Sequence, residues 1–245
     1  MIWITGDTHG DWVHRLNMNS FPEQKEMTKD DYVIICGDFG IWNDSSQQRW
    51  NLNWLEERNF TTLFVDGNHE NYDLLNSYPV SEWYGGKVHF IKPSVIHLMR
   101  GQIFNIEYRT FFTFGGARSH DIKDGILEID DPRIKSWKKD PDKMNRINHI
   151  SWWEEEMPNE KEMAEGRENL ELAGNKVDFI ITHCAPSSTQ AILSGGFYEP
   201  DKLTKYLESI KCGVDYKTWI FGHYHIDKSV TSKDICLFEQ IVRIN

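Results

Sequence analysis

Five short apolar runs, each followed directly by Gly, Asp or His, place the strongest constraint on the fold of this chain. They are rich in β-branched and aromatic residues and comprise residues 2–5, 32–36, 62–65, 179–182 and 219–221. Continuous apolar runs of this length, bounded by turn residues, are typical of strands that are covered on both faces. Segments of helical periodicity lie between the runs, at residues 45–58, 158–174 and 200–211. This alternation of strands and helices predicts an α/β sheet.

The middle and the end of the chain have a different pattern. Residues 95–99, 103–107 and 110–114 are expected to form consecutive strands joined by short turns, and residues 228–231 are expected to pair with residues 235–240. These antiparallel pieces predict a second sheet packed on the first. Residues 121–157 are charged, contain proline and have too few large apolar residues for a core of their own. We therefore expect one domain over residues 1–245 with a charged insertion at 121–157.

Composition limits the partners that the chain can have. The net charge of −11 argues against bulk nucleic-acid binding, which needs a basic surface. A phosphorylated substrate would need a local excess of positive charge, and bound metal ions could provide it. No stretch approaches the ~18 apolar residues of a membrane span, and no signal peptide is recognisable. Cys36 and Cys236 lie in apolar runs, as in proteins with reduced thiols. We expect a cytoplasmic protein without membrane contact; its oligomeric state stays open.

The polar residues that follow the five apolar runs form a set suited to metal binding. If the runs are neighbouring strands of one sheet, their ends gather these residues at a single rim, where open α/β sheets bind ligands. Imidazole, carboxylate and amide groups favour manganese, iron or zinc over a thiolate-bound structural zinc. The i, i+2 spacing within the first and last segments lets both members face the same side of an extended chain. The segments are Gly6-Asp7-Thr8-His9-Gly10, Gly37-Asp38, Gly67-Asn68-His69-Glu70, Thr182-His183 and Gly222-His223-Tyr224-His225.

Asp38 is the natural candidate for a carboxylate that bridges two cations, since it stands alone in its segment. With Asp7 and Asp38 as the anionic ligands, two divalent cations leave a net charge of about +2 for a bridging hydroxide and a phosphate. Taken singly, each segment has an ordinary interpretation as a turn, a helix cap or a hydrogen-bonded histidine. Five such segments after five apolar runs favour the metal site.

The ordered set resembles the calcineurin-like metallophosphoesterase superfamily, whose signature runs Asp-x-His, Gly-Asp, Gly-Asn-His-Glu/Asp, a single His and Gly-His-x-His. All five elements occur in this order between residues 7 and 225. The resemblance implies two packed mixed β-sheets flanked by helices, in a four-layer sandwich. It also implies two divalent metal ions. One would be held by Asp7, His9, Asp38 and His225, and the other by Asp38, Asn68, His183 and His223.

By the same resemblance, the chain is expected to hydrolyse phosphate mono- or diesters by in-line attack of a metal-bound hydroxide. Asp38 and His69 are the expected catalytic residues, and His69 would contact the phosphate or protonate the leaving oxygen. Asn68, His69 and Arg118 are the expected substrate-binding residues; Arg118 follows a Phe-rich strand and is either a phosphate ligand or part of a solvated turn. Trp152 and Trp153 are either an aromatic wall of the site or a docking patch.

The second motif departs from the phosphoprotein-phosphatase branch, which continues Gly-Asp-x-x-Asp/Asn-Arg-Gly. Here Ile41 stands where an acid would orient His69, and Trp42 stands where an arginine would hold phosphate. Asp44 and Asp73 are alternatives for the missing acid. The departure points away from a close protein-phosphatase homologue and toward a broader or nucleotide-directed phosphoesterase. The substrate class itself, a small molecule, a nucleotide or a phosphoprotein, stays open. The alternative function is a metal-binding scaffold for a protein partner whose chemistry has weakened.

Overall fold

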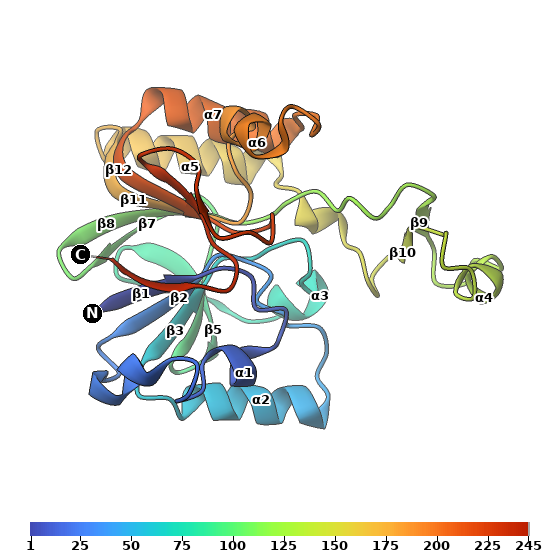
Figure 1. Cartoon of the computed structure of the whole chain (residues 1–245), viewed down its shortest axis with the longest axis horizontal. Coiled ribbons are helices and arrows are strands. Elements are labelled where there is room, and N and C mark those ends of the chain that lie inside the picture. Colours follow the sequence, from blue (N-terminus) through green and yellow to red (C-terminus); the bar gives the residue numbers. More distant parts are fainter. Residues whose placement is uncertain (245) are drawn as a thin grey trace.

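The computed structural model describes residues 1–244 and contains two stacked β-sheets whose outer faces are covered by helices (Figure 1). The seven-stranded sheet has the order β15-β1-β2-β3-β6-β5-β4, and the six-stranded sheet has the order β13-β14-β12-β11-β8-β7. Both sheets are mixed, with parallel strands in the centre and antiparallel strands at the edges. The parallel strands are β1, β2, β3 and β6 in the first sheet and β14, β12, β11 and β8 in the second. The predicted four-layer arrangement is confirmed.

The strands of the first sheet are β1 (Ile2–Thr5), β2 (Tyr32–Ile35), β3 (Thr61–Phe64), β4 (Val80–Trp83), β5 (Gly86–Lys92), β6 (Val95–Leu98) and β15 (Ile241–Ile244). Those of the second are β7 (Gln102–Ile106), β8 (Arg109–Phe114), β11 (Lys176–Thr182), β12 (Asp215–Phe221), β13 (Lys228–Ser229) and β14 (Asp234–Cys236). The helices are α1 (Trp12–Arg15), α2 (Ser46–Glu56), α3 (Tyr72–Leu75), α4 (Ile134–Trp137), α5 (Glu160–Leu172), α6 (Ser187–Ser194) and α7 (Lys202–Gly213), with short 3-10 turns at Pro22–Glu26 and Glu154–Glu156.

Side-chain alternation along the central strands builds three apolar layers. In β2, Ile34 faces the core between the sheets, whereas Val33 and Ile35 face the core beneath α1 and α2. In β11, Ile181 lies between the sheets and Ile180 faces α5 and α7. Each central strand is therefore buried on both faces, which explains the continuous apolar runs in the sequence.

The five apolar runs do not belong to one sheet, contrary to the simplest expectation from the sequence. β1, β2 and β3 are in the seven-stranded sheet, whereas β11 and β12 are in the six-stranded sheet. The segment 95–98 also differs, because it extends the first sheet next to β3 instead of the second. The physical reason is that both sheets bury both of their faces, so the apolar pattern is the same in each. The expected pairing near the C-terminus is present as β13 against β14.

The start of α2 fixes the chain segment that follows Asp38. Ser45 caps the helix by accepting a hydrogen bond from the Gln48 backbone N–H at 3.2 Å. The Gln48 side chain accepts from the backbone N–H groups of Trp42 and Asn43, at 3.2 Å each. The predicted helix start is therefore correct, and the segment 42–45 is tied to the first turn of α2.

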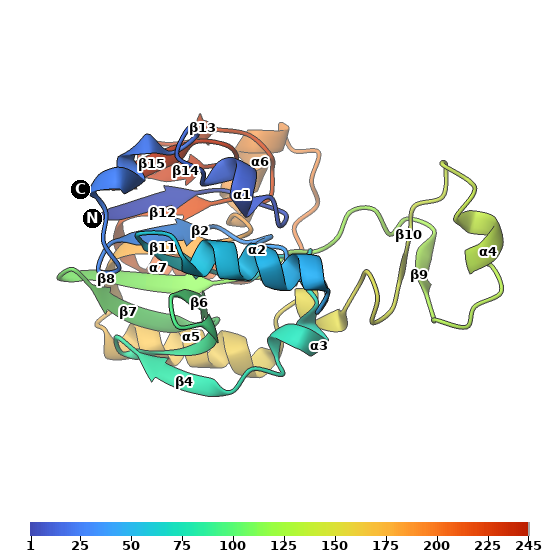
Figure 2. The ribbon, with the colours of Figure 1, turned by 90° about the horizontal axis from the view of Figure 1, so that it is seen from below.

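The insertion at residues 121–157 extends away from the two sheets as an arm (Figures 1 and 2). Its strands β9 (Gly125–Leu127) and β10 (Asn145–Ile147) pair in parallel and form a separate two-stranded sheet, and α4 lies near its tip. The arm returns to the sandwich at Trp153, which is 5% exposed and packs in the apolar core that includes Phe39 and Tyr72. Among residues 1–244, no helix has the length and apolar character needed to cross a bilayer.

A buried arginine links the loops on one flank of the sandwich. Arg100, in the turn between β6 and β7, donates to Asp66 at 2.6 and 2.9 Å and to the Tyr72 hydroxyl at 2.9 Å. It also donates to the backbone carbonyl of Glu155 at 2.7 Å, at the base of the arm. Burial alone would raise the pKa of Asp66, but the Arg100 charge and a hydrogen bond with His97 hold this pKa well below its usual range. Arg100 therefore compensates a buried carboxylate directly before the Gly67-Asn68-His69 motif.

Replacing Arg100 by Ala is expected to destabilise the fold by about 3–5 kcal/mol, because it leaves the Asp66 charge buried without a cation. Chemical denaturation of the variant and the wild type measures this difference. Arg109→Ala is the matched control; Arg109 pairs with Glu107 at the surface, and its loss is expected to cost less than about 1 kcal/mol. Equal stabilities of the two variants would contradict the role given to Arg100.

Candidate metal centre

The segments that follow β1, β2, β3, β11 and β12 meet at one edge shared by the two sheets. All seven predicted metal ligands come from these five segments. Their meeting depends on the stacking of the sheets, because β1 to β3 supply four ligands and β11 and β12 supply three. The rim predicted from the sequence therefore exists, although it is built from two sheets instead of one.

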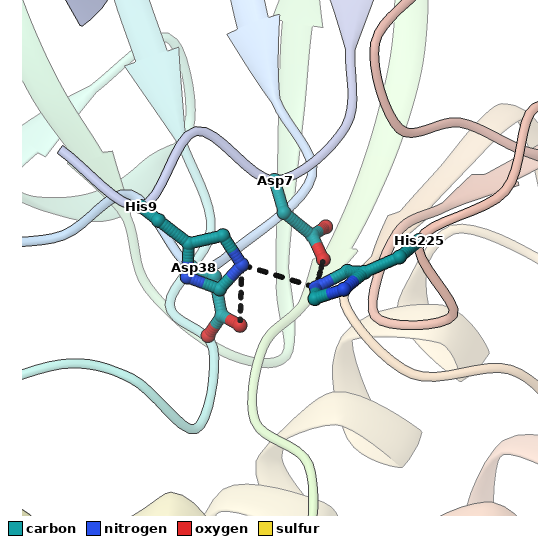
Figure 3. A group of neighbouring side chains, drawn as sticks. All are labelled: Asp7, His9, Asp38 and His225. Carbon is teal, nitrogen blue, oxygen red and sulfur yellow. Dashed lines mark hydrogen bonds and ion pairs between the residues drawn. The ribbon is translucent and has the colours of Figure 1, made fainter. Parts of the chain in front are cut away.

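Four of the predicted ligands form a compact group in which one atom of each lies within 4.8 Å of the others (Figure 3). They are Asp7, His9, Asp38 and His225. The Nε2 atoms of His9 and His225 lie 3.0 Å apart, and His225 Nε2 is 3.2 Å from Asp7 Oδ2. His9 Nε2 is 3.8 Å from Asp38 Oδ2. Two imidazole nitrogens that face each other between two carboxylates are the arrangement expected around a shared cation.

Of the other predicted ligands, His183 lies against the second carboxylate oxygen of Asp38. His183 Nε2 is 3.4 Å from Asp38 Oδ1 and 3.2 Å from Asn68 Oδ1. The second nitrogen of this ring, Nδ1, is 2.8 Å from the backbone carbonyl of Cys36 and can donate to it, which orients Nε2 towards Asp38. The His223 ring packs edge-on against His183 with centroids 4.9 Å apart. Asp38 thus contacts His9 through one carboxylate oxygen and His183 through the other.

The backbone is adapted to this close packing. A Cβ atom at Gly67 would lie 2.1 Å from Asp38 Oδ1, and one at Gly222 would lie 2.0 Å from Asp7 Oδ1. Only glycine at these two positions lets the carboxylates approach the neighbouring segment. His9, Asp38, His223 and His225 have φ values of 47°, 45°, 69° and 49°, in the left-handed region that side chains rarely adopt. Such strain concentrates at functional sites, where the surrounding structure imposes it.

The buried carboxylates of the site have histidine side chains as their ionic partners. Asp7 and Asp38 are each 1% exposed, and among residues 1–244 neither carboxylate forms an ion pair with Lys or Arg. Two other buried acids do have such partners: Asp66 is 2.6 Å from Arg100, and Asp234 is 2.6 Å from Lys211. A buried carboxylate needs a compensating charge. The donor set at Asp7 and Asp38 therefore fits bound cations.

The histidines respond to this negative charge. Burial lowers the pKa of His183, but the charges of Asp38 and Asp7 outweigh burial and raise this pKa to about 10. Burial and the nearby His183 charge lower the pKa of His223 well below its usual value. Burial would raise the pKa of Asp38, yet His183, His69 and His9 hold it well below the usual range. The site favours positive charge at its centre, and a divalent cation would take the place of the proton on His183.

Glu70 organises the segment that carries Asp38, a role that sequence reasoning missed. Its carboxylate is 1% exposed and accepts backbone hydrogen bonds from Phe39 at 2.6 Å, Gly40 at 3.1 Å and Ile41 at 2.9 Å. The Asp38 side chain in turn accepts from the His69 backbone N–H at 2.8 Å. Burial and the Asp38 charge raise the pKa of Glu70 well above its usual value. The fourth residue of the Gly-Asn-His-Glu motif was the available signal for this role.

His69 lies beside the compact group, with its ring edge-on to His9 at a centroid distance of 5.4 Å. Ile41, where an acid was expected, is fully buried in the apolar core. Neither alternative acid contacts His69 in the described part of the chain: Asp44 pairs with Arg49, and Asp73 contacts His149 and Trp153. Burial lowers the pKa of His69, and the charge of Asp38 opposes this effect.

The loop after β8 reaches the same edge of the sheets. His120 Nε2 is 3.1 Å from His223 Nε2. Ser119 accepts from the Asn68 side chain at 3.4 Å and donates to the buried Glu156 at 2.6 Å. Arg118 is exposed and lines a neighbouring pocket of about 420 Å³ together with His120. Arg118 thus lies close to the candidate centre without a contact to any predicted ligand.

Comparison with known proteins decides the family. A family model described as calcineurin-like phosphoesterase matches residues 1–227. The chain belongs to this family. The match extends two residues beyond His225 and so includes every predicted ligand of this calcineurin-like phosphoesterase.

One similar solved structure is the crystal structure of the phosphopantetheinyl hydrolase from Mycobacterium tuberculosis. It shares 17% sequence identity, and the alignment has a TM-score of 0.43 and covers 97% of this chain and 89% of that one. No curated protein matches this chain.

Replacing Glu70 by Ala is expected to lower bound metal and to destabilise the fold by about 3 kcal/mol or more, since three buried N–H groups lose their acceptor. Metal analysis after gel filtration and chemical denaturation measure the two effects. The control is Glu56→Ala, which removes an acceptor from one backbone N–H, that of Ser94. Full metal content in the Glu70→Ala protein would contradict the role of Glu70 in holding Asp38.

Proposed function

We propose that this calcineurin-like phosphoesterase hydrolyses small-molecule phosphate esters through a binuclear metal centre. The observation that carries the proposal is the burial of Asp7 and Asp38, without Lys or Arg partners among residues 1–244, between two groups of imidazole ligands. The proposed ligands of one metal are Asp7, His9, Asp38 and His225. Those of the second are Asp38, Asn68, His183 and His223.

Divalent cations at these positions, manganese or alternatively iron or zinc, would polarise the phosphoryl oxygens and supply a nucleophile at neutral pH. The protein contributes the geometry. Asp38 lies between the two ligand groups and is held by the His69 backbone N–H, while Asp7 accepts from the His223 backbone N–H at 2.9 Å. These hydrogen bonds fix the carboxylates before any ligand binds, so little reorganisation is needed.

His69 is the proposed general acid. Its ring lies beside His9 and lines a pocket together with Asn68, so it can reach the leaving oxygen of an ester bound at the centre. The Asn68 amide nitrogen, which contacts Ser119, is available to orient a phosphoryl oxygen. Arg118 is a second proposed phosphate ligand, on the side of His120. A scaffold that only binds a partner would have no use for an acid in this position.

The proposal is tested with manganese-loaded protein and two chromogenic substrates, a phosphate monoester and a phosphodiester. We expect turnover of at least one, its loss on chelation and its return with manganese. His69→Ala is expected to keep its metal and to lose about 10²–10⁴-fold in kcat, the usual contribution of a general acid. The matched control is His14→Ala, because the His14 side chain is 83% exposed and lies outside the site.

Two outcomes would count against this function. Absence of turnover of either ester, with two metals bound per chain, would favour the scaffold. Unchanged kcat in the His69→Ala protein would remove the proposed general acid.

A further inference from the structure

A small pocket lies between the insertion and the candidate metal centre. It has a volume of about 230 Å³ and is lined on one side by Trp42, Asn68 and His69. The returning arm contributes Arg146, Ile150, Ser151 and Trp153 to the lining. Pockets that enclose whole drug-sized ligands have about 300–1,000 Å³. This pocket therefore has room for one ring-sized part of a ligand next to the proposed general acid.

Arg146 is the one Lys or Arg side chain among the described residues that line this pocket. It forms an ion pair with Asp121 through a single guanidinium nitrogen, and within residues 1–244 its side chain has no other hydrogen-bond partner. A guanidinium has five N–H donors, so several stay free for an anion. The charges of Arg146 and Asp121 both act on the His69 ring, which agrees with their position next to it.

Trp42, Ile150 and Trp153 give the pocket apolar walls, and Glu70 and Ser151 complete its lining. The Trp42 side chain is 47% exposed and donates from Nε1 to the His69 backbone carbonyl at 2.9 Å. Ile150 is 51% exposed, whereas Trp153 is nearly buried and donates to Asp73 at 2.8 Å. A half-exposed Trp and Ile that line the same pocket, together with a fixed Trp, are suited to contact a flat apolar group.

We propose that the insertion completes the substrate-binding site: Arg146 binds the phosphate, and Trp42 and Ile150 contact a ring-sized, apolar leaving group. This inference rests on the proposed function of the neighbouring metal centre, since the phosphate must lie between Arg146 and the metal ligands. Asp121 is a positioning residue that orients the guanidinium. The substrates that fit are phosphate esters of a compact aromatic alcohol, in preference to esters of small aliphatic alcohols.

Binding of phenylphosphonate and methylphosphonate to the manganese-loaded protein tests this proposal by isothermal titration calorimetry. Both compounds carry a phosphonate that resists hydrolysis. They differ in the group on phosphorus, which is a phenyl ring in one and a methyl group in the other. We expect the wild type to bind phenylphosphonate about tenfold more tightly, from burial of part of the ring. Arg146→Gln is expected to weaken binding of both compounds about 10- to 100-fold, because a charge-assisted hydrogen bond is lost, and to keep its metal. Ile150→Ser is expected to reduce the difference in affinity between phenylphosphonate and methylphosphonate.

Matched controls come from the same insertion. Arg133→Gln replaces an exposed arginine that pairs with Asp131, and Ile129→Ser replaces an isoleucine that is 70% exposed; neither residue lines the pocket. Both are expected to bind the two compounds as the wild type does. Equal affinity of the wild type for the two phosphonates, or binding of neither, would overturn the assignment of the pocket. Unchanged affinities in the Arg146→Gln protein would overturn the role of Arg146.

These readouts separate the inference from the function on which it rests. A protein that prefers phenylphosphonate and loses this preference in Ile150→Ser, yet hydrolyses no ester, would refute the proposed activity and leave the pocket assignment intact. A protein that hydrolyses esters but binds phenylphosphonate and methylphosphonate equally well would refute the pocket assignment and leave the proposed activity intact.

Discussion

The buried carboxylates of Asp7 and Asp38 are the constraint on which the rest of the site depends. Taking a carboxylate out of water is costly unless hydrogen bonds and opposite charge compensate it. The chain provides the hydrogen bonds through the backbone N–H groups of His223 and His69. It provides the space through glycines where a Cβ would collide with each carboxylate. Within residues 1–244 it pairs neither carboxylate with Lys or Arg, whereas Asp66 and Asp234 do have such partners. Bound metal ions would supply the missing positive charge.

Glu70 and Arg100 hold the loops that carry these carboxylates. Glu70 binds three successive backbone N–H groups after Asp38, and Arg100 joins Asp66 to Tyr72 and to the base of the arm. Asn68 and His69 therefore lie, along the chain, between two buried side-chain networks. The network of Arg100 and Asp66 precedes them, and that of Glu70 follows them. Four proposed ligands with left-handed backbone conformations are kept in place by this surrounding structure. Part of the stability of the fold is thus used to preorganise the site.

The sequence predicted the ligand segments and the two-sheet architecture because both leave local signals. Asp7 and His9, for example, directly follow an apolar run, and their spacing is visible without any tertiary information. Membership of each strand in one sheet or the other left no such signal, since both sheets are buried on both faces. The role of Glu70 depends on contacts with a segment 30 residues away and is invisible in its own neighbourhood. Arg146 lies in a weakly periodic, charged insertion, and only the return of the arm brings it next to His69.

The most direct test of the binuclear centre is anomalous diffraction at the manganese edge from crystals of the metal-loaded protein. We expect two peaks about 3.5–4 Å apart, the usual separation in two-metal sites, with the Asp38 carboxylate bound to both. A single peak, or two peaks of which only one contacts Asp38, would contradict the assignment of Asp38 as the bridging ligand and with it the proposed mechanism.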